Sequence, residues 1–544
     1  MLIVGDLSGI QDYLFDIGHE GGGQARRLRA RSFFIQMLAE CAALRVRRGL
    51  GWTADTVVFS GAGKFMLSGP TTSDAVARVQ IERGTLNCWL LTQTGGHLKL
   101  ALVADVDAGS PVDQYERAML ALQKEKLRPW VGIGASDGRW NPDGLILDPL
   151  DRPCAICRHR RAAVDERDRD TGAVHRVCVR CRSDSQVGQR LPRMKWIVIR
   201  ETPAAEDMDV AGLGVGLSAD PPAPPESGDL AVANLQHPDR PPDGWPRERI
   251  LARQLARHIP SDRDGAPLDF TELAGEARGD KLLGVLKMDG DSLGVKLDAL
   301  LRDAVDLENL ARFSRRLDEF MAGTLDAELQ KSKWSKTYTI FAGGDDLLLV
   351  GPWHLLFAYA AHVRDLFMAQ FGAEGLTISA GLSFFRPTRP ILRAAEEAER
   401  LLEAAKTTPA PNAHQPKDQM ASFGQIWKWT DHQGVLSSGE QLARWIDGKQ
   451  AKRGWLFTLL ELAELRHGSG ADTTDRLRAT ARLDYHVTRN YPTIRDRDPE
   501  KVALREWADR LVRDFDDAKD VQTTFLPAIV RYALTATRDA AEED

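Results

Sequence analysis

The sequence lacks any apolar run long enough to cross a bilayer, any strong excess of one charge, and the cysteine density of a disulfide-rich protein. A membrane-spanning helix needs about 20 consecutive apolar residues, so we expect no membrane partner. The formal net charge of −6 gives no overall basic character, so nucleic-acid contacts would be local or made through partner subunits. Six cysteines in 544 residues do not suggest a disulfide framework. Met1 leads into a strand-like segment rather than a signal peptide, so we expect a cytoplasmic protein.

The remaining composition is that of an ordinary globular protein, with 43% hydrophobic and 28% charged residues. A chain of 544 residues is too long for one hydrophobic core. We therefore expect two to four domains.

The most informative segment is 339–350, which reads TIFAGGDDLLLV. Apolar runs flank two glycines and two aspartates, which predicts a β-hairpin whose tight turn carries both carboxylates. Glycine permits a positive φ and lets a ligand approach the backbone closely. Adjacent carboxylates repel each other, and a bound divalent cation relieves that repulsion. We therefore expect Gly343 and Gly344 to contact a nucleotide, and Asp345 and Asp346 to bind metal.

A further acid lies upstream, where the strand-like segment LLGVLKM runs into Asp289. A strand-end aspartate followed by a Gly-Gly-Asp-Asp hairpin is typical of nucleotidyl-transfer palm domains, in which acids on neighbouring antiparallel strands bind paired Mg²⁺ ions. An ordinary Asp-Gly turn beside a solvated aspartate is the alternative. We expect Asp289, Asp345 and Asp346 to be the catalytic acids and to hold two Mg²⁺ or Mn²⁺ ions.

The chain contains this pattern twice. The segment 57–70, VVFSGAGKFMLSGP, aligns with the segment 339–352, TIFAGGDDLLLVGP. At nearly the same separation, Asp6 of the N-terminal GDLSG aligns with Asp289. We predict two copies of one α/β unit.

The two copies differ at the tip of the hairpin. The first copy has Gly63 and Lys64 where the second has its two aspartates. A two-metal centre without these carboxylates loses most of its affinity for cations, so the first copy is predicted to be catalytically silent. It could still hold a nucleotide through Asp6, Ser8 and Lys64, although a solvated hairpin lysine is an equal alternative for Lys64.

Four of the six cysteines form two C-x-x-C pairs, namely Cys154, Cys157, Cys178 and Cys181. Their spacing matches that of a zinc ribbon. The charge-rich segment between the pairs cannot bury a core, and a metal would substitute for one. We predict a structural Zn²⁺ site, with a redox dithiol as the alternative. His159 and His175 are interpreted as bystanders, since four thiolates are available.

Other segments give weaker signals. The proline density of 203–246 predicts an exposed connector and a boundary near 250. An amphipathic helix is expected over 391–406, where Lys406 would either reach a triphosphate or complement the helix dipole. The basic run 26–31, RRLRAR, is either a solvated helix start or a contact for nucleic acid, ATP phosphate or an acidic partner subunit. From about Gly439 onward we expect a helical interaction domain.

Together these motifs resemble the large subunit of type III (Csm/Cmr) CRISPR interference complexes, a cyclic oligoadenylate synthase. The resemblance covers the whole chain and rests on GDLSGIQDYLF, RLRARSFF, the C-x-x-C pairs, KMDGDSLG, AGGDD and the SFG of Ser422–Gly424. It implies an α/β (α+β) chain with two ferredoxin-like palm domains, an inserted zinc ribbon and a C-terminal helical domain. The implied order is first palm, zinc ribbon with Pro-rich connector, second palm and helical domain, over 1–145, 146–250, 251–430 and 431–544.

The resemblance also implies a function. The chain would be a Mg²⁺-dependent nucleotidyltransferase of antiviral defence that converts ATP to cyclic oligoadenylate and releases pyrophosphate. ATP would lie between the active and the silent palm, and target RNA held elsewhere in the complex would activate the enzyme. The implied partners are the other type III effector subunits, crRNA and target RNA.

The sequence departs from the family in two places. Members usually begin with an HD-type nuclease domain, whereas this sequence starts at the first palm and has no His-Asp dipeptide, so we expect no DNase activity. The Asp-Val-Asp-Asn-like strand motif appears as Asp289-Gly290-Asp291-Ser292, which keeps the metal acids and leaves the asparagine unmatched.

Two alternative functions are considered. A GGDEF-like diguanylate cyclase would use GTP and would need a dimer, and the internal duplication argues against it. A scaffold subunit would organise an RNA–protein particle with little catalysis, and the intact Asp-Asp hairpin argues against that.

Overall fold

The computed structural model describes the chain except for residues 18–22, 62, 108, 132, 134, 137–138, 141–150, 168–171, 239, 252–257, 297–306, 468–471, 492–497, 516–519 and 539–544. The chain divides into two compact units. Unit 1 comprises Met1–Phe270, Ser292–Leu347 and Arg389–Leu392, and unit 2 comprises Thr271–Asp291, Leu348–Thr388 and Arg393–Asp544. The finer division into four domains stays a prediction. Among the described residues, no helix is both long and apolar enough to span a membrane.

Unit 1 is built on an antiparallel sheet with the strand order β2-β3-β1-β4. Its strands are β1 (Leu2–Ser8), β2 (Val57–Gly61), β3 (Lys64–Ser68) and β4 (Lys99–Asp105). Successive side chains of a strand point to opposite faces, and both faces of this sheet are covered. Helices α2 (Gln24–Gly49), α3 (Ala75–Thr94), α4 (Pro111–Lys126) and α8 (Leu307–Asp318) pack against it.

The core on one face of this sheet joins segments that are far apart in sequence. Leu2 and Val4 of β1 pack against residues of α4 such as Tyr115 and Leu122. Leu310 of α8 belongs to the same core. Helix α8 continues through a π-helical turn, η5 (Glu319–Thr324), into α9 (Leu325–Leu329).

The basic run 26–31 lies inside α2, which begins at Gln24. Arg27, Arg29 and Arg31 are buried. Each has a partner in unit 1: Arg27 pairs with Glu166 at 2.8 Å, Arg29 donates to the Tyr338 hydroxyl, and Arg31 pairs with Asp184 at 3.2 Å. Both sequence interpretations of these three arginines were wrong. Their side chains are buried and bind other residues of unit 1, so they are neither solvated nor exposed to a ligand.

The segment between the two copies is folded. The hairpin of β7 (Val164–Arg167) and β8 (Val174–Val177) lies between the two cysteine pairs, and the second pair lies at the start of α5 (Val179–Arg190). A second antiparallel sheet has the order β10-β11-β9-β12, with β9 (Trp196–Arg200), β10 (Met208–Val210), β11 (Leu213–Ser218) and β12 (Asp229–Asn234). The predicted exposed connector over 203–246 was therefore wrong. Four of its prolines lie in the loop between β11 and β12, while Val210, Val215 and Val232 are buried.

The other large sheet has the order β14-β15-β13-β16-β17-β18. Its strands are β13 (Leu283–Asp291), β14 (Tyr338–Gly343), β15 (Asp346–Pro352), β16 (Thr377–Phe385), β17 (Gln419–Ser422) and β18 (Gln425–Lys428). Its first four strands repeat the order β2-β3-β1-β4 of the first sheet. The predicted internal duplication is therefore confirmed at the level of topology.

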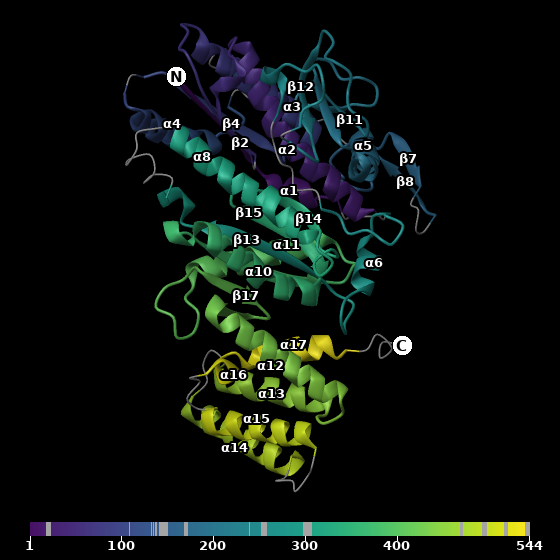
Figure 1. The fold of residues 1–544 in the computed structure, drawn as a ribbon, viewed down its shortest axis with the longest axis vertical. Helices are drawn as coiled ribbons and strands as arrows, with labels where there is room; N and C mark the ends of the chain where they lie inside the picture. The colour runs from purple at the N-terminus through teal and green to yellow at the C-terminus, as the bar shows by residue number, and fades with distance from the viewer. Residues whose placement is uncertain are drawn as a thin grey trace. The chain divides into compact units, whose positions relative to one another are not determined.

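Unit 2 joins its strands to the C-terminal helices in one core. Helices α10 (Trp353–Phe371), α11 (Ile391–Thr407), α12 (Trp429–Asp447), α13 (Arg453–His467), α14 (Thr473–Asn490), α15 (Pro499–Asp514), α16 (Val521–Thr524) and α17 (Leu526–Ala536) belong to it (Figure 1). The Phe357 ring of α10 lies 4.8 Å from the His432 ring and 5.4 Å from the Tyr532 ring, centroid to centroid. The helical prediction for this region is confirmed.

Candidate active site

The predicted hairpin forms from β14 and β15, with Gly344 and Asp345 as its two turn residues. Gly344 has φ 59°, which favours glycine at the first position of a tight turn. Its N–H donates to the Asp318 carboxylate at 3.1 Å. Asp345 and Asp346 are both half-buried, so their carboxylates keep some access to solvent. Asp318 was not predicted from the sequence, where an aspartate at the end of α8 gives no signal.

Asp289 lies in β13 and is paired with a cation from its own unit. The Lys406 ammonium donates to the Asp289 carboxylate, and it also donates to the carbonyl of Gly290 at 3.2 Å. Both side chains are about four-fifths buried. Because the mostly buried Asp289 carboxylate already binds the Lys406 ammonium, it is also suited to bind a metal cation, as an acid of a palm domain would. Lys406 contacts Asp289 in this structure, an arrangement that neither sequence interpretation included.

Asp291, the last residue of β13, is buried and held by a set of donors. The hydroxyls of Thr377 and Ser379 donate to its carboxylate at 2.7 and 2.9 Å, and the backbone N–H of Asp418 donates at 3.0 Å. These bonds stabilise the charged carboxylate inside the protein. Asp291 therefore fastens the end of β13 to the neighbouring strand and loop, and Asp289 is the more accessible acid of this strand.

The first copy shows different chemistry at the matching positions. Asp6 of β1 is buried and pairs with Lys126 of α4 at 2.6 Å. In the ladder between β1 and β3, Asp6 lies directly opposite Lys64. Lys64 is exposed and Ser8 is half-buried at the end of β1. Two lysines around one aspartate neutralise the charge that would attract a divalent cation.

The four cysteines come together as a buried cluster. All four Sγ atoms lie within 4.8 Å of one another, and those of Cys157 and Cys178 are 3.9 Å apart. Tetrahedral zinc with bonds of about 2.3 Å requires sulfur separations of about 3.8 Å. Hydrogen bonds with Cys154 raise the pKa of the other three thiols, because Cys154 accepts these bonds as the thiolate of the cluster. The donor set fits Zn²⁺, which would release the remaining protons.

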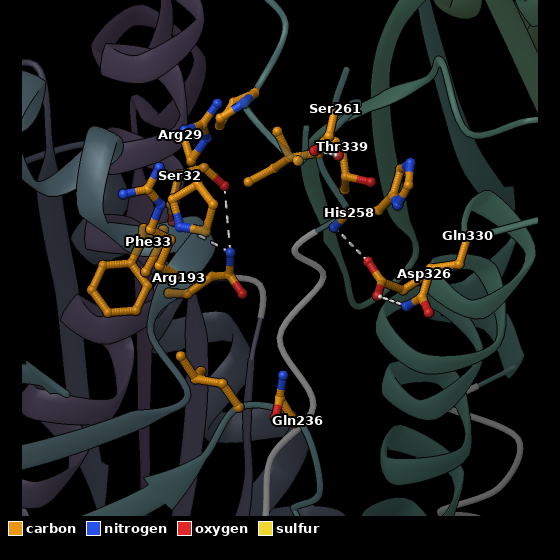
Figure 2. Close-up of a pocket in the computed structure, with 17 residues that line it drawn as sticks. Arg29, Ser32, Phe33, Arg193, Gln236, His258, Ser261, Asp326, Gln330 and Thr339 are labelled. Atoms are coloured by element: carbon orange, nitrogen blue, oxygen red, sulfur yellow. Dashed lines mark hydrogen bonds between the residues drawn. The ribbon is translucent and has the colours of Figure 1, made fainter. Parts of the chain in front are cut away.

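A separate pocket of about 300 Å³ lies in unit 1 and contains none of the predicted site residues (Figure 2). Its polar groups largely satisfy one another. The backbone N–H of His258 donates to Asp326 at 2.7 Å, and the Gln330 amide donates to the same carboxylate at 3.2 Å. Burial lowers the pKa of His258, so the ring is neutral at pH 7. The arrangement supports a structural role for these side chains.

Comparison with protein families identifies both copies. Residues 1–128 match domain B of the Csm1 subunit, and residues 282–415 match the second palm domain of Cas10/Cmr2. Both matched segments are thus similar to domains of Cas10/Csm1 proteins. The family resemblance and the fold class predicted from the sequence are thereby confirmed.

Curated relatives carry the same family name. The chain is 25% identical over 500 residues to the Cas10/Csm1 single-strand-specific deoxyribonuclease (subtype III-A) of Thermococcus onnurineus, covering 86% of this chain and 62% of the relative. It is 24% identical over 563 residues to the same protein of Mycobacterium tuberculosis, covering 96% of this chain and 65% of the relative. The chain thus spans less than two thirds of the length of these relatives.

Solved structures share the fold of this chain. A Csm1–Csm4 cassette in complex with AMPPNP has a TM-score of 0.71 at 20% identity, covering 99% of this chain and 69% of that chain. The cassette in complex with cA4 has a TM-score of 0.70 at 20% identity, covering 99% and 70%.

Proposed function

We propose that this chain is the nucleotidyl cyclase of a type III effector complex and converts ATP to cyclic oligoadenylate with release of pyrophosphate. The Csm1–Csm4 cassettes of the same fold have been crystallised with ATP, with pppApA and with the cyclic products cA3 and cA4. Those ligands are a substrate, a linear intermediate and products of this reaction. They support ATP over GTP, which a diguanylate cyclase would use.

The observation that carries the proposal is the difference between two copies of one topology. In the first copy, the ladder places Asp6 opposite Lys64. The alignment of the copies puts Asp289 at the position of Asp6 and Asp346 at the position of Lys64. The same register in the second copy would bring one carboxylate from each strand together, and Asp345 would add another from the turn. Only the second copy thus has the acids of a two-metal site.

Each residue then has a distinct task. Asp289, Asp345 and Asp346 hold the divalent cations. When bound, two Mg²⁺ or Mn²⁺ ions lower the pKa of the acceptor hydroxyl and stabilise the leaving pyrophosphate. Gly343 and Gly344 let the triphosphate approach the hairpin backbone. Lys406 leaves Asp289 for the phosphates as the cations bind, so the charge near Asp289 stays balanced.

The first copy serves as the non-catalytic half of the nucleotide site. Lys64 is exposed beside the ion pair of buried Asp6 with Lys126, and it offers an ammonium to a phosphate. Ser8 at the end of the same strand adds a hydroxyl. The partners are a Csm4-like subunit, other type III effector subunits, crRNA and the activating target RNA. The four cysteines hold a structural Zn²⁺.

The test uses the chain assembled with its effector partners, target RNA, Mg²⁺ and labelled ATP. Because several kcal/mol of transition-state stabilisation depend on the cations, Asp345→Asn/Asp346→Asn should lower cyclic product formation at least about 100-fold. Asp365→Asn, an exposed aspartate of α10, is the matched control and should leave the rate unchanged. Undiminished product formation by the double variant would overturn the proposal.

Two further measurements settle the alternatives. Competition between ATP and GTP separates an oligoadenylate synthase from a diguanylate cyclase, and absence of any metal-dependent turnover would favour a scaffold. The curated relatives are named single-strand-specific deoxyribonucleases. The expectation that this chain has no DNase activity stays a prediction, which degradation of labelled single-stranded DNA would contradict.

A further inference from the structure

Three metal-ligating side chains from three separate segments of unit 1 converge outside the four-cysteine cluster. The Nε2 atoms of His97 and His159 are 3.0 Å apart, and Nε2 of His159 is 3.2 Å from an Oδ atom of Asp16. One ligand atom from each residue lies within 4.8 Å of the others. Asp16 follows α1 (Ile10–Phe15), His97 precedes β4, and His159 follows the first C-x-x-C pair.

The two short contacts of His159 Nε2 cannot both be strong hydrogen bonds. A neutral imidazole Nε2 has either one N–H or one lone pair in the ring plane, so it can direct one strong bond. His159 Nε2 is within reach of both His97 Nε2 and the Asp16 carboxylate. The two rings meet edge to face, with 66° between their planes, rather than stacking. A single cation could accept all three lone pairs at once, whereas a proton can be shared by only two of the atoms.

The backbone around His97 is held in place independently of any ion. A Cβ on Gly9, which has φ 80°, would lie 1.9 Å from the His97 carbonyl oxygen, so only glycine permits this approach. The Thr94 hydroxyl accepts from the Leu98 N–H at 3.2 Å and donates to the Leu90 carbonyl at 2.7 Å. These contacts fix the turn that presents His97.

Hydrogen bonds within unit 1 also hold the backbone at Asp16 and at the turn before His159. Buried Arg31 donates to the Asp16 carbonyl at 2.8 Å and pairs with Asp184 of α5. The turn before His159 is closed by the Arg158 N–H, which donates to the Cys154 carbonyl at 3.0 Å. When the backbone already positions the ligand residues, the site loses little conformational entropy as an ion binds.

We propose that Asp16, His97 and His159 form a second metal site, which binds a divalent first-row transition metal ion such as Zn²⁺. The spacings fit such an ion, because bonds of about 2.0–2.1 Å in tetrahedral geometry put neighbouring ligand atoms about 3.3 Å apart. Two imidazoles and one carboxylate suit zinc and its neighbours rather than Mg²⁺ or Ca²⁺. The His159 side chain is 40% exposed, so water can fill the fourth position. The ion would cross-link the cysteine module to the first palm.

The probe is Co²⁺ added to the zinc-loaded full-length chain. The wild-type protein should take up one equivalent and develop d–d absorption without the sulfur-to-cobalt charge-transfer bands of a thiolate site. His97→Gln and Asp16→Asn should each weaken this uptake at least about 10-fold. His175→Gln is the matched control, because His175 belongs to the cysteine module and lies outside the cluster.

The outcomes are distinguishable from a failure of folding or of the cysteine site. The zinc content and the melting temperature of each variant report on the fold, and Asp16→Asn keeps the size of the side chain and one acceptor oxygen while it removes the charge. If the cysteines held no zinc, Co²⁺ would enter them and produce the charge-transfer bands. A wild-type chain that takes up no cobalt outside the cysteines, or His97→Gln and Asp16→Asn variants that bind it as tightly as His175→Gln, would overturn the proposal.

Discussion

Replacing Arg31 with Met should strongly destabilise unit 1, although the basic run looks from its sequence like a solvated or ligand-binding surface. Arg31 is 1% exposed, pairs with Asp184, and donates to the backbone carbonyls of Tyr13 and Asp16. The substitution would leave two buried carbonyls without this donor, at about 1 kcal/mol or more each. Asp184 would keep its bond from Arg180 at 3.0 Å but lose half of its compensating charge. Breaking buried pairs of this kind costs about 3–5 kcal/mol.

Hydrogen exchange of peptides from α2 and α5 measures this loss locally, which suits a chain of two units. A loss of 3 kcal/mol or more corresponds to at least about 100-fold faster exchange of the most protected amides. Arg48→Met, in the same helix, is the matched control. Arg48 and Glu201 form an exposed pair, with 45% and 61% of their side chains accessible, so its loss should cost less than about 1 kcal/mol. Equal exchange in both variants, with weaker RNA or ATP binding by Arg31→Met, would refute the structural role.

Three further predictions concern pH, zinc and Lys406. Burial lowers the pKa of His432 to about 4, below the unfolded value of 6.5, so the stability of unit 2 should fall by up to about 3 kcal/mol as the pH drops from 6.5 to 4. Denaturant titrations should show a shallower pH slope for His432→Gln, and an identical slope would contradict this assignment. Cys178→Ser or a strong chelator should remove the zinc and increase exchange in β7, β8 and α5, whereas Cys88→Ser, at an exposed thiol, should retain the metal. Lys406→Met removes the ammonium that competes for Asp289, so ATP conversion should reach half its maximum at a lower Mg²⁺ concentration. An unchanged Mg²⁺ requirement with a higher KM for ATP would assign Lys406 to the triphosphate alone.

The hairpin, the duplication and the cysteine cluster could be predicted because each is encoded by local spacing. A two-residue turn with glycine between apolar runs specifies a hairpin within a few residues, and β14 and β15 formed there. Helix α11 spans Ile391–Thr407, as the apolar periodicity of 391–406 indicated. Two C-x-x-C pairs need only a turn and a hairpin to bring four thiols together.

The predictions made from composition for 203–246 and for the basic run 26–31 were wrong, because the burial of these segments depends on residues that are distant in sequence. Four prolines of 203–246 lie in the loop between β11 and β12, but the strands on either side of that loop bury valines against β9, which the proline count does not reveal. The charges of the basic run are equally visible in the sequence, yet their partners Glu166, Asp184 and Tyr338 lie far along the chain.

The amino-acid sequence alone determined the family resemblance, the repeated α/β unit, the hairpin that carries Asp345 and Asp346, and the cluster of four cysteines, because these depend on residue types at short, regular spacing. Only the tertiary structure decided that Lys406 contacts Asp289, that Asp291 is held by Thr377 and Ser379, and that His97 and His159 meet beside Asp16. Those contacts join residues tens to more than a hundred positions apart. Tertiary packing brings such residues together, and no local sequence pattern predicts these contacts.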